Sequence, residues 1–336
     1  MKKKFLSMFM ICMFGVSLLA VAQEKNNTTK EKKMTREEVK AQMLNIVAGF
    51  TKVPRSPILR RPDEYGMEYE DVFFPSMDGT VLEGWFIPAK EKSDKIIICN
   101  HFSPGNRYGY AGHLDAWNTS GGFEVNFLPK YKALHDAGYN VLAYDLRNHG
   151  FSAPGAAGGY NPHFFEYRDV IGSIRYVKNR EDTKDMKISL QSICLGANST
   201  LVAMEKHPEE FEDIQSLILI QPLSGEALVK KLCENLGLGE LGEEMFEEAY
   251  REVSGFSVTD SSPIKNAKHV RIPTFVLQVK EDTMTYPSDV QAVYDAIPVK
   301  DKKLFWIEGT PWRFHGYTYF SEHPEQMIEW YDSHMQ

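Results

Sequence analysis

Short apolar runs alternate with longer stretches of helical spacing along most of this chain. Runs of this kind are typical of strands that are covered on both faces of a sheet. They lie at residues 95–99, 140–144, 188–191, 216–220, 274–279 and 304–307. The helical patterns lie at residues 127–137, 164–178, 195–204 and 325–334. This alternation predicts an α/β fold, with a mostly parallel sheet and helices on both of its faces.

Two further elements precede the alternating pattern. Residues 69–74 and 81–87 have strand patterns on either side of the turn Ser76-Met77-Asp78-Gly79, which predicts an N-terminal antiparallel hairpin. Upstream, Thr35-Arg36-Glu37-Glu38 is a capping box that opens a helix through about Phe50. We expect this helix to pack on the domain rather than to take part in chemistry.

One acidic segment interrupts the alternation. Residues 224–250 have a helical pattern rich in glutamate and come before the next strand. They predict a small helical insert at about 224–262 on top of the sheet. The insert is either a lid over a site or a solvated decoration of the surface.

The first residues have the three parts of a secretory signal. Met1-Lys-Lys-Lys4 is basic, residues 5–19 are apolar, and Ala20-Val21-Ala22 provides small residues for cleavage. The apolar run is shorter than the roughly 20 residues that a membrane span needs, which favours a cleaved signal over an anchor. The predicted division is therefore a signal peptide at 1–22, a linker and helix at 23–64, and one large domain at 65–336. We expect an exported protein, periplasmic or secreted, with no membrane span after cleavage.

Composition narrows the function classes. The 336 residues are 43% hydrophobic and 12% aromatic, enough for one large core, and the net charge of −8 argues against a nucleic-acid partner. The sequence has no His-Glu-x-x-His, no Cys/His cluster at ligand spacing and no glycine-rich phosphate or dinucleotide fingerprint. We therefore expect no metal and no cofactor. The oligomeric state stays open.

The strand at 188–191 turns sharply into the helix at 195–204, and Cys194 lies at the turn. Such a reversal crowds the backbone, so the residues two before and two after its apex must be small, as Ser192 and Gly196 are. A thiol at a helix N-terminus feels the positive end of the helix dipole, which favours a nucleophilic thiolate. Free cysteines are also common in cores, so Cys194 could instead be structural.

Two further candidate residues follow later strands. Ligands of parallel sheets bind at the carboxyl ends of the strands, where Asp282 follows residues 274–279 and His315 follows residues 304–307. The predicted order is nucleophile Cys194, acid Asp282 and base His315, with Glu281 as a competitor for the acid. Each residue alone would be ordinary surface, and their shared position is what favours catalysis. We place His315 on a loop after the final strand.

Acyl transfer also needs hydrogen-bond donors for an oxyanion. The backbone N–H of Leu195 is one candidate, and that of Phe102 is the other, with Ser103 as the fallback. The loop at 103–123 is rich in Gly, Tyr and Trp. Its Tyr108 and Trp117 either line a substrate pocket or pack within a surface loop.

Three cysteines lie beyond the predicted signal. Their odd number means that at least one of them stays unpaired, which is compatible with a free thiol at Cys194. Whether Cys99 and Cys233 form a disulfide stays open.

Several of these motifs together resemble the α/β hydrolases. Asn100-His101-Phe102 resembles their His-Gly oxyanion motif, and Asp145-Leu-Arg-Asn-His-Gly-Phe-Ser152 is similar to the Asp-x-Arg-x-x-Gly-x-Ser turn after their fourth strand. The resemblance extends from about Glu68 to the C-terminus. A cysteine at the elbow resembles the dienelactone-hydrolase branch, whose nucleophile is Cys with His and Asp.

The resemblance implies an α/β-hydrolase fold and an enzyme. The implied reaction is hydrolysis of a small acyl substrate, an ester, thioester or lactone, through a Cys-His-Asp triad and a thioacyl intermediate. Two alternatives remain. One is a non-hydrolytic binding protein in which Cys194 is structural, and the other is an acyltransferase that uses the same triad.

Overall fold

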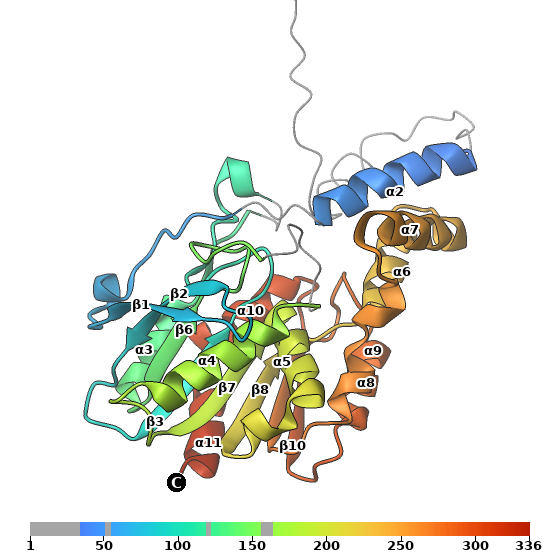
Figure 1. Ribbon diagram of the computed structural model, residues 1–336. Helices are drawn as coiled ribbons and strands as arrows, with labels where there is room; N and C mark the ends of the chain where they lie inside the picture. Colours follow the sequence, from blue (N-terminus) through green and yellow to red (C-terminus); the bar gives the residue numbers. More distant parts are fainter. Residues whose placement is uncertain (1–33, 51–54, 119–121, 156–163) are drawn as a thin grey trace, which may run out of the picture.

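Eight strands form one sheet whose order confirms the predicted α/β architecture (Figure 1). The computed structural model describes residues 34–50, 55–118, 122–155 and 164–336. Strands that neighbour one another from β6 to β10 run parallel, whereas β2 pairs antiparallel with both β1 and β6. In sheet order they are β1 (Glu70–Pro75), β2 (Val81–Ile87), β6 (Asn140–Tyr144), β3 (Lys95–Asn100), β7 (Lys187–Ile193), β8 (Ile214–Ile220), β9 (Thr274–Val279) and β10 (Lys302–Ile307).

Helices cover both faces of this sheet, as the apolar strands predicted (Figure 1). In β3, Ile96 and Ile98 belong to one buried cluster, while Ile97 and Cys99 belong to another, because side chains alternate between the faces of a strand. The first cluster includes α4 (Tyr167–Asn179), α5 (Leu195–Lys206), α8 (Pro263–Ala267) and α9 (Pro287–Ala296). The second includes α3 (Leu128–Asp136), α10 (Arg313–Glu322) and α11 (Glu325–His334).

Two segments have more structure than the sequence predicted. The loop at 103–123 contributes β4 (Gly109–Tyr110), which pairs antiparallel with β5 (Val125–Asn126), and a single 3-10 turn, η2 (Asp115–Trp117). The segment after β10 was predicted to be a loop at His315, but helix α10 begins there at Arg313. This difference decides which side chains of the segment face the interior.

The helical insert and the N-terminal helix pack on each other. The insert comprises α6 (Gly225–Asn235), α7 (Gly239–Ser254) and the short turn η4 (Val258–Ser261), and α2 (Arg36–Phe50) lies beside α7 (Figure 1). Val39, Met43 and Val47 share an apolar cluster with the insert, apart from the two clusters that cover the sheet. At its edge, Arg36 forms ion pairs with glutamates of α7.

The capping box that predicted α2 is present. The Thr35 N–H donates to Glu38 Oε2 at 2.8 Å, and the Glu38 N–H donates to Thr35 Oγ1 at 3.3 Å. The predicted signal and linker at 1–33 lie outside the described residues. Within the described ranges, no helix combines the length and the apolar character that a membrane crossing requires.

Met43 tests the contact between α2 and the insert. Its side chain is fully buried, so Met43→Ala should lower the free energy of unfolding of this unit by about 2–5 kcal/mol through lost burial and a residual cavity. Hydrogen exchange of the α7 amides measures this change. Asn45→Ala, at an exposed position of the same helix, is the matched control. Equal protection of α7 in the two variants would contradict the packing.

Candidate active site

Cys194 lies at the tip of the predicted strand-turn-helix, between β7 and α5. Its backbone has φ 50° and ψ −105°, a conformation that costs free energy in any residue with a side chain. Its N–H donates to the carbonyl of Ile220 at 2.8 Å, and its thiol is only partly buried. Backbone strain of this kind is characteristic of functional sites, because a purely structural cysteine does not require it.

The two small residues around Cys194 are both tightly packed, and Gly196 has the space-saving role that the sequence suggested. A Cβ atom on Gly196 would lie 2.6 Å from the carbonyl oxygen of Asn100, so the end of β3 passes directly over α5. Ser192 is buried, and its hydroxyl accepts from Asn100 Nδ2 at 2.9 Å and contacts Thr200 Oγ1 at 2.8 Å. These contacts fix the elbow against the neighbouring strand.

The two predicted oxyanion donors, the N–H groups of Leu195 and Phe102, flank the close contact between Gly196 and Asn100. Leu195 is the first helical residue, so its N–H has no acceptor within α5. The carbonyl of His101 accepts from Gly196 N at 3.1 Å, which fixes the peptide that carries the Phe102 N–H. In the described part of the chain, no hydrogen bond occupies the Phe102 N–H. The oxyanion hole itself stays a prediction.

Asp282 points into the protein, whereas its competitor Glu281 is exposed. The Asp282 carboxylate accepts from Gln278 Nε2 at 2.9 Å and from the backbone N–H of Met284 at 2.9 Å. Its third partner is Nη1 of Arg313, and both side chains of this ion pair are 1% exposed. Asp282 is therefore a buried carboxylate that accepts from three donors.

Arg313, rather than a histidine, connects Asp282 to the thiol. Its Nε donates to the Tyr317 hydroxyl at 2.8 Å. Both the guanidinium and the Tyr317 phenol interact with the Cys194 side chain. The thiol thus faces a cation and a hydroxyl in the place where a triad has an imidazole.

His315 lies elsewhere. Its ring is exposed, its Nδ1 contacts Thr310 Oγ1 at 2.6 Å, and it lies 5.5 Å from the ring of Phe123. Two residues along a helix correspond to a rotation of about 200°, so Arg313 and His315 point to opposite sides of α10. Among the described residues, no hydrogen bond or ion pair joins His315 to Asp282. The structure therefore does not bring these two predicted residues together, and the role of His315 stays a prediction.

Gln221 holds Arg313 in this position. It follows β8 with φ 58°, and its Nε2 donates to the Arg313 carbonyl at 2.6 Å. In return, Arg313 Nη2 donates to the carbonyl of Gln221. A Cβ atom on Gly316 would clash with Gln221 Nε2, so this glycine makes room for the two hydrogen bonds between Gln221 and Arg313.

Sequence reasoning missed Arg313, Tyr317 and Gln221. A helical reading of residues 313–322 would have found the first two, because Arg313, Gly316, Tyr317 and Phe320 recur at the spacing of one buried helix face. Gln221 gave no signal of its own, since a lone glutamine after a strand is ordinary.

The electrostatics keep both partners of the thiol protonated. Burial by itself would lower the pKa of Arg313, but Tyr317, Asp282 and Cys194 together raise this pKa above its ordinary value. Burial also raises the pKa of the Tyr317 phenol well above its ordinary value. Both groups are therefore hydrogen-bond donors at neutral pH, and neither accepts a proton.

Two buried histidines near the elbow are neutral. Burial lowers the pKa of His101 to about 4 and the pKa of His149 to about 3. His101 Nδ1 lies 2.7 Å from the Phe102 carbonyl, and its Nε2 accepts from the Leu146 N–H at 2.9 Å. Both ring nitrogens of His101 are thus engaged in hydrogen bonds within the neighbouring turns.

The predicted substrate-binding residues have different environments. Tyr108 is fully buried and its hydroxyl donates to Glu124, so this residue packs within the loop rather than lining a cavity. Trp117 is partly exposed and lies with its ring at 6.4 Å from that of Tyr110. Residues 119–121 of the same loop lie outside the described residues.

The other two cysteines beyond the predicted signal are separate from the site. Cys99 and Cys233 are both buried free thiols, which answers the question of their pairing. Burial raises the pKa of Cys99 to about 11 and that of Cys233 to about 12. Both therefore stay protonated and unreactive near neutral pH.

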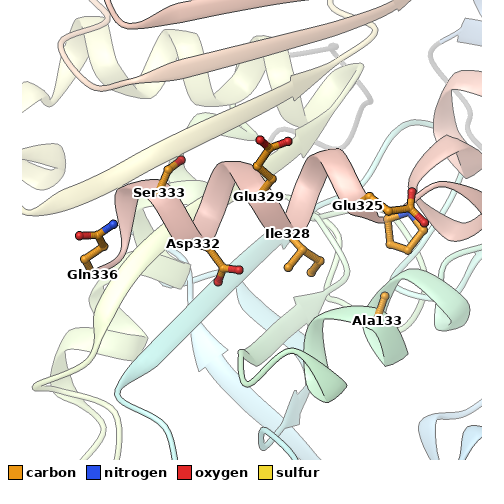
Figure 2. A pocket seen from close by; sticks show the side chains of 8 residues that line it. Ala133, Glu325, Ile328, Glu329, Asp332, Ser333 and Gln336 are labelled. Carbon is orange, nitrogen blue, oxygen red and sulfur yellow. The ribbon is translucent and has the colours of Figure 1, made fainter.

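A surface depression lies between α3 and α11 (Figure 2). Its lining includes Ala133, Ile328 and the carboxylates of Glu325, Glu329 and Asp332, and none of the predicted catalytic residues. Within the described ranges, no group of three or more His, Cys, Asp or Glu side chains is arranged to hold a metal ion.

Curated relatives are similar over part of the chain. The uncharacterised protein YfhR of Salmonella typhi is 30% identical over 144 residues, which are 41% of this chain and 41% of that protein. The uncharacterised protein YqkD of Bacillus subtilis is 22% identical over 233 residues, 68% of each chain. The match thus spans about two fifths of the first relative. No family model matches the chain.

Several solved structures are similar to this chain over most of its length. The esterase Pf2001 of Pyrococcus furiosus has a TM-score of 0.63 at 21% identity, covering 84% of this chain and 97% of the esterase. The chain has the α/β-hydrolase fold. A dienelactone hydrolase from Anabaena variabilis shares this fold with a TM-score of 0.52 at 14% identity, covering 80% of this chain and 99% of that enzyme.

Gly196 gives a direct test of the elbow. Because the Cβ of Gly196→Ala would meet backbone atoms of Asn100, we expect the free energy of unfolding to fall by about 1–3 kcal/mol. Urea unfolding followed by fluorescence measures this change. Gly66→Ala is a control at a glycine with open space around it, though its positive φ adds some strain of its own. An unchanged stability in Gly196→Ala would contradict the close approach.

The neutral histidines predict a pH dependence of stability. A folded-state pKa of about 4 for His101, below its ordinary 6.5, means that the unfolded chain binds more protons between these values. Stability should therefore be present above about pH 6.5 and fall by about 3 kcal/mol on acidification to about pH 4. The measurement is urea unfolding at several pH values in the parent and in His101→Gln, with exposed His269→Gln as control. The same pH slope in all three proteins would contradict the assignment.

Proposed function

We propose that this protein is a hydrolase of small acyl compounds in which Cys194 is the nucleophile. The observation that carries the proposal is the strained backbone of Cys194 at a helix N-terminus, where Arg313 and Tyr317 interact with the thiol. The α/β-hydrolase fold supports hydrolysis as the reaction class. Ester, thioester and lactone bonds remain the proposed substrates.

The first half of the reaction needs only the groups that surround the thiol. The Arg313 cation and the Tyr317 hydroxyl stabilise a thiolate, which attacks the acyl carbon to form a C–S bond. The N–H groups of Leu195 and Phe102 would then donate to the oxyanion. Collapse of this intermediate expels the leaving group with its electron pair and leaves a thioacyl enzyme.

In this proposal Arg313 replaces the histidine of the predicted Cys194-His315-Asp282 triad. A guanidinium does not lose its proton in proteins, so it acts through its charge and not as a base. Asp282 then has the task of positioning Arg313, as an acid in a triad positions an imidazole. His315 retains its predicted role only if the start of α10 rearranges.

One observation favours a second candidate, a binding protein of the same fold without hydrolysis. Asp282 and Arg313 neutralise each other, and the described residues next to the thiol offer no base to activate water. Such a site can bind an anion or an acyl compound without turning it over. The acyltransferase alternative shares the thioacyl enzyme and differs only in the acceptor.

We also propose that the protein is exported. The basic, apolar and small-residue segments of positions 1–22 support a cleaved signal and a periplasmic or secreted enzyme. N-terminal sequencing of the protein purified from its native compartment tests this, and a start near Gln23 is expected.

Hydrolysis of a panel of aryl esters, thioesters and lactones tests the catalytic assignment. Cys194→Ala should abolish turnover, and Arg313→Met should lower kcat/KM by roughly 10²-fold or more, as losses of electrostatic stabilisation do. Arg313→Lys retains the charge and should recover part of the rate. His315→Gln should remain within about twofold of the parent, because its ring lies outside the site.

The same panel includes a control for the elbow. Ser192→Ala removes a buried hydroxyl beside Cys194 but no group that reaches the thiol, so its folded fraction should remain active. Activity that survives in Cys194→Ala, or disappears in His315→Gln alone, would contradict the proposed roles. No turnover by folded parent protein would favour the binding candidate.

A further inference from the structure

The groups that face the Cys194 thiol are donors that keep their protons. Arg313 is a permanent cation, and its Nε occupies the Tyr317 oxygen at 2.8 Å. In a triad, the imidazole takes the proton of the nucleophile and later returns it to the leaving group. Neither Arg313 nor Tyr317 can carry out this shuttle, because neither first accepts a proton.

The two buried histidines near the elbow are already engaged in hydrogen bonds. His101 uses both ring nitrogens, toward the Phe102 carbonyl and the Leu146 N–H. His149 lies between the Arg147 carbonyl and the Ser103 hydroxyl, at 2.9 Å and 3.0 Å.

The carboxylate of the site and the predicted base, His315, have other partners as well. Asp282 is held by Arg313, Gln278 and the Met284 N–H. His315 points away from Cys194, toward Thr310 and Phe123. Within the described residues, the site has no group that shuttles a proton to a departing oxygen or nitrogen.

From this geometry we infer the substrate class: acyl donors whose leaving group departs as a stable anion, namely thioesters and aryl or enol esters. Simple alkyl esters and amides are excluded, since their leaving groups need a proton at the moment of bond cleavage. The inference rests on the proposed function of Cys194 as the nucleophile. It goes beyond that function by assigning selectivity to the leaving-group side of the substrate.

The chemistry balances without a shuttle. The thiolate attacks the acyl carbon, the C–S bond forms, and the bond to the leaving group breaks with its electron pair on the departing anion. Water then attacks the thioacyl carbon, the C–S bond breaks, and the thiolate is regenerated with release of a carboxylate and two protons to solvent. The part of the chain that the structure describes also offers no base for this second half, so the thioacyl enzyme should accumulate.

The pKa of the leaving group decides which substrates react slowly without a general acid. Thiols and phenols have pKa values of about 8.5 and about 10, whereas water, a guide to alcohols, has about 15.7. General acid catalysis typically contributes roughly 10²–10⁴-fold. Its absence therefore acts selectively against leaving groups of the alcohol type.

The experiment uses one acyl group on several leaving groups. The kcat/KM values for 4-nitrophenyl, phenyl, thiophenyl and ethyl butyrate are measured with parent protein, with Cys194→Ala as the blank, and intact mass after quenching detects the butyryl adduct. We expect rapid cleavage of the aryl and thio esters, a stoichiometric adduct, and an ethyl ester rate at least 10³-fold below that of the phenyl ester. An ethyl ester cleaved within tenfold of the phenyl ester overturns the inference.

Failure of the proposed function gives a different result. In that case no ester is consumed faster than with Cys194→Ala and no adduct forms on the parent, and the inference falls with the function. Arg313→His provides an independent arm, because it introduces a proton shuttle beside the thiol. Where this variant folds, the ratio of ethyl to phenyl ester rates should rise relative to Arg313→Lys, and an equal ratio in both variants counts against the inference.

Discussion

The buried ion pair between Asp282 and Arg313 is the interaction on which the site depends. Burying two charges costs free energy, and such a pair persists where further hydrogen bonds satisfy both partners. Gln278 and the Met284 N–H complete Asp282, while the Gln221 carbonyl and Tyr317 complete Arg313. The pair thereby joins the ends of β8 and β9 to the first turn of α10. It also fixes the rotation of α10, which brings Arg313 to the thiol and turns His315 outward.

The rest of the elbow is consistent with this pair. Close contact between Gly196 and Asn100 leaves no freedom in the turn, and the neutral His101 holds the neighbouring loop through its two ring nitrogens. Among the residues that the structure describes, the polar groups next to Cys194 are the Arg313 guanidinium, the Tyr317 phenol and backbone N–H groups. All of these are donors. An environment composed of donors stabilises negative charge on sulfur and on a developing oxyanion, but it moves no protons.

Much of this architecture follows from the sequence. The apolar runs, the hairpin, the insert and the sharp turn at Cys194 were predictable because each depends on local periodicity or on small residues at fixed spacing. Asp282 was predictable from its place after a buried strand. The partner of Asp282 was not, because it depends on where α10 begins, and a shift of two residues exchanges Arg313 for His315 on the inner face. Gln221 escaped notice because its role exists only in three dimensions.

We propose that Arg313, and not a histidine, sets the reactivity of Cys194. The most direct measurement is the rate of alkylation of Cys194 by iodoacetamide between pH 5.5 and 9, followed by peptide mass spectrometry in the parent, Arg313→Gln, Arg313→Lys and His315→Gln. Buried Cys99 and Cys233 should not compete. We expect that at pH 6 the rate of alkylation falls more than tenfold in Arg313→Gln, recovers in part in Arg313→Lys and changes less than twofold in His315→Gln. A loss confined to His315→Gln would contradict it.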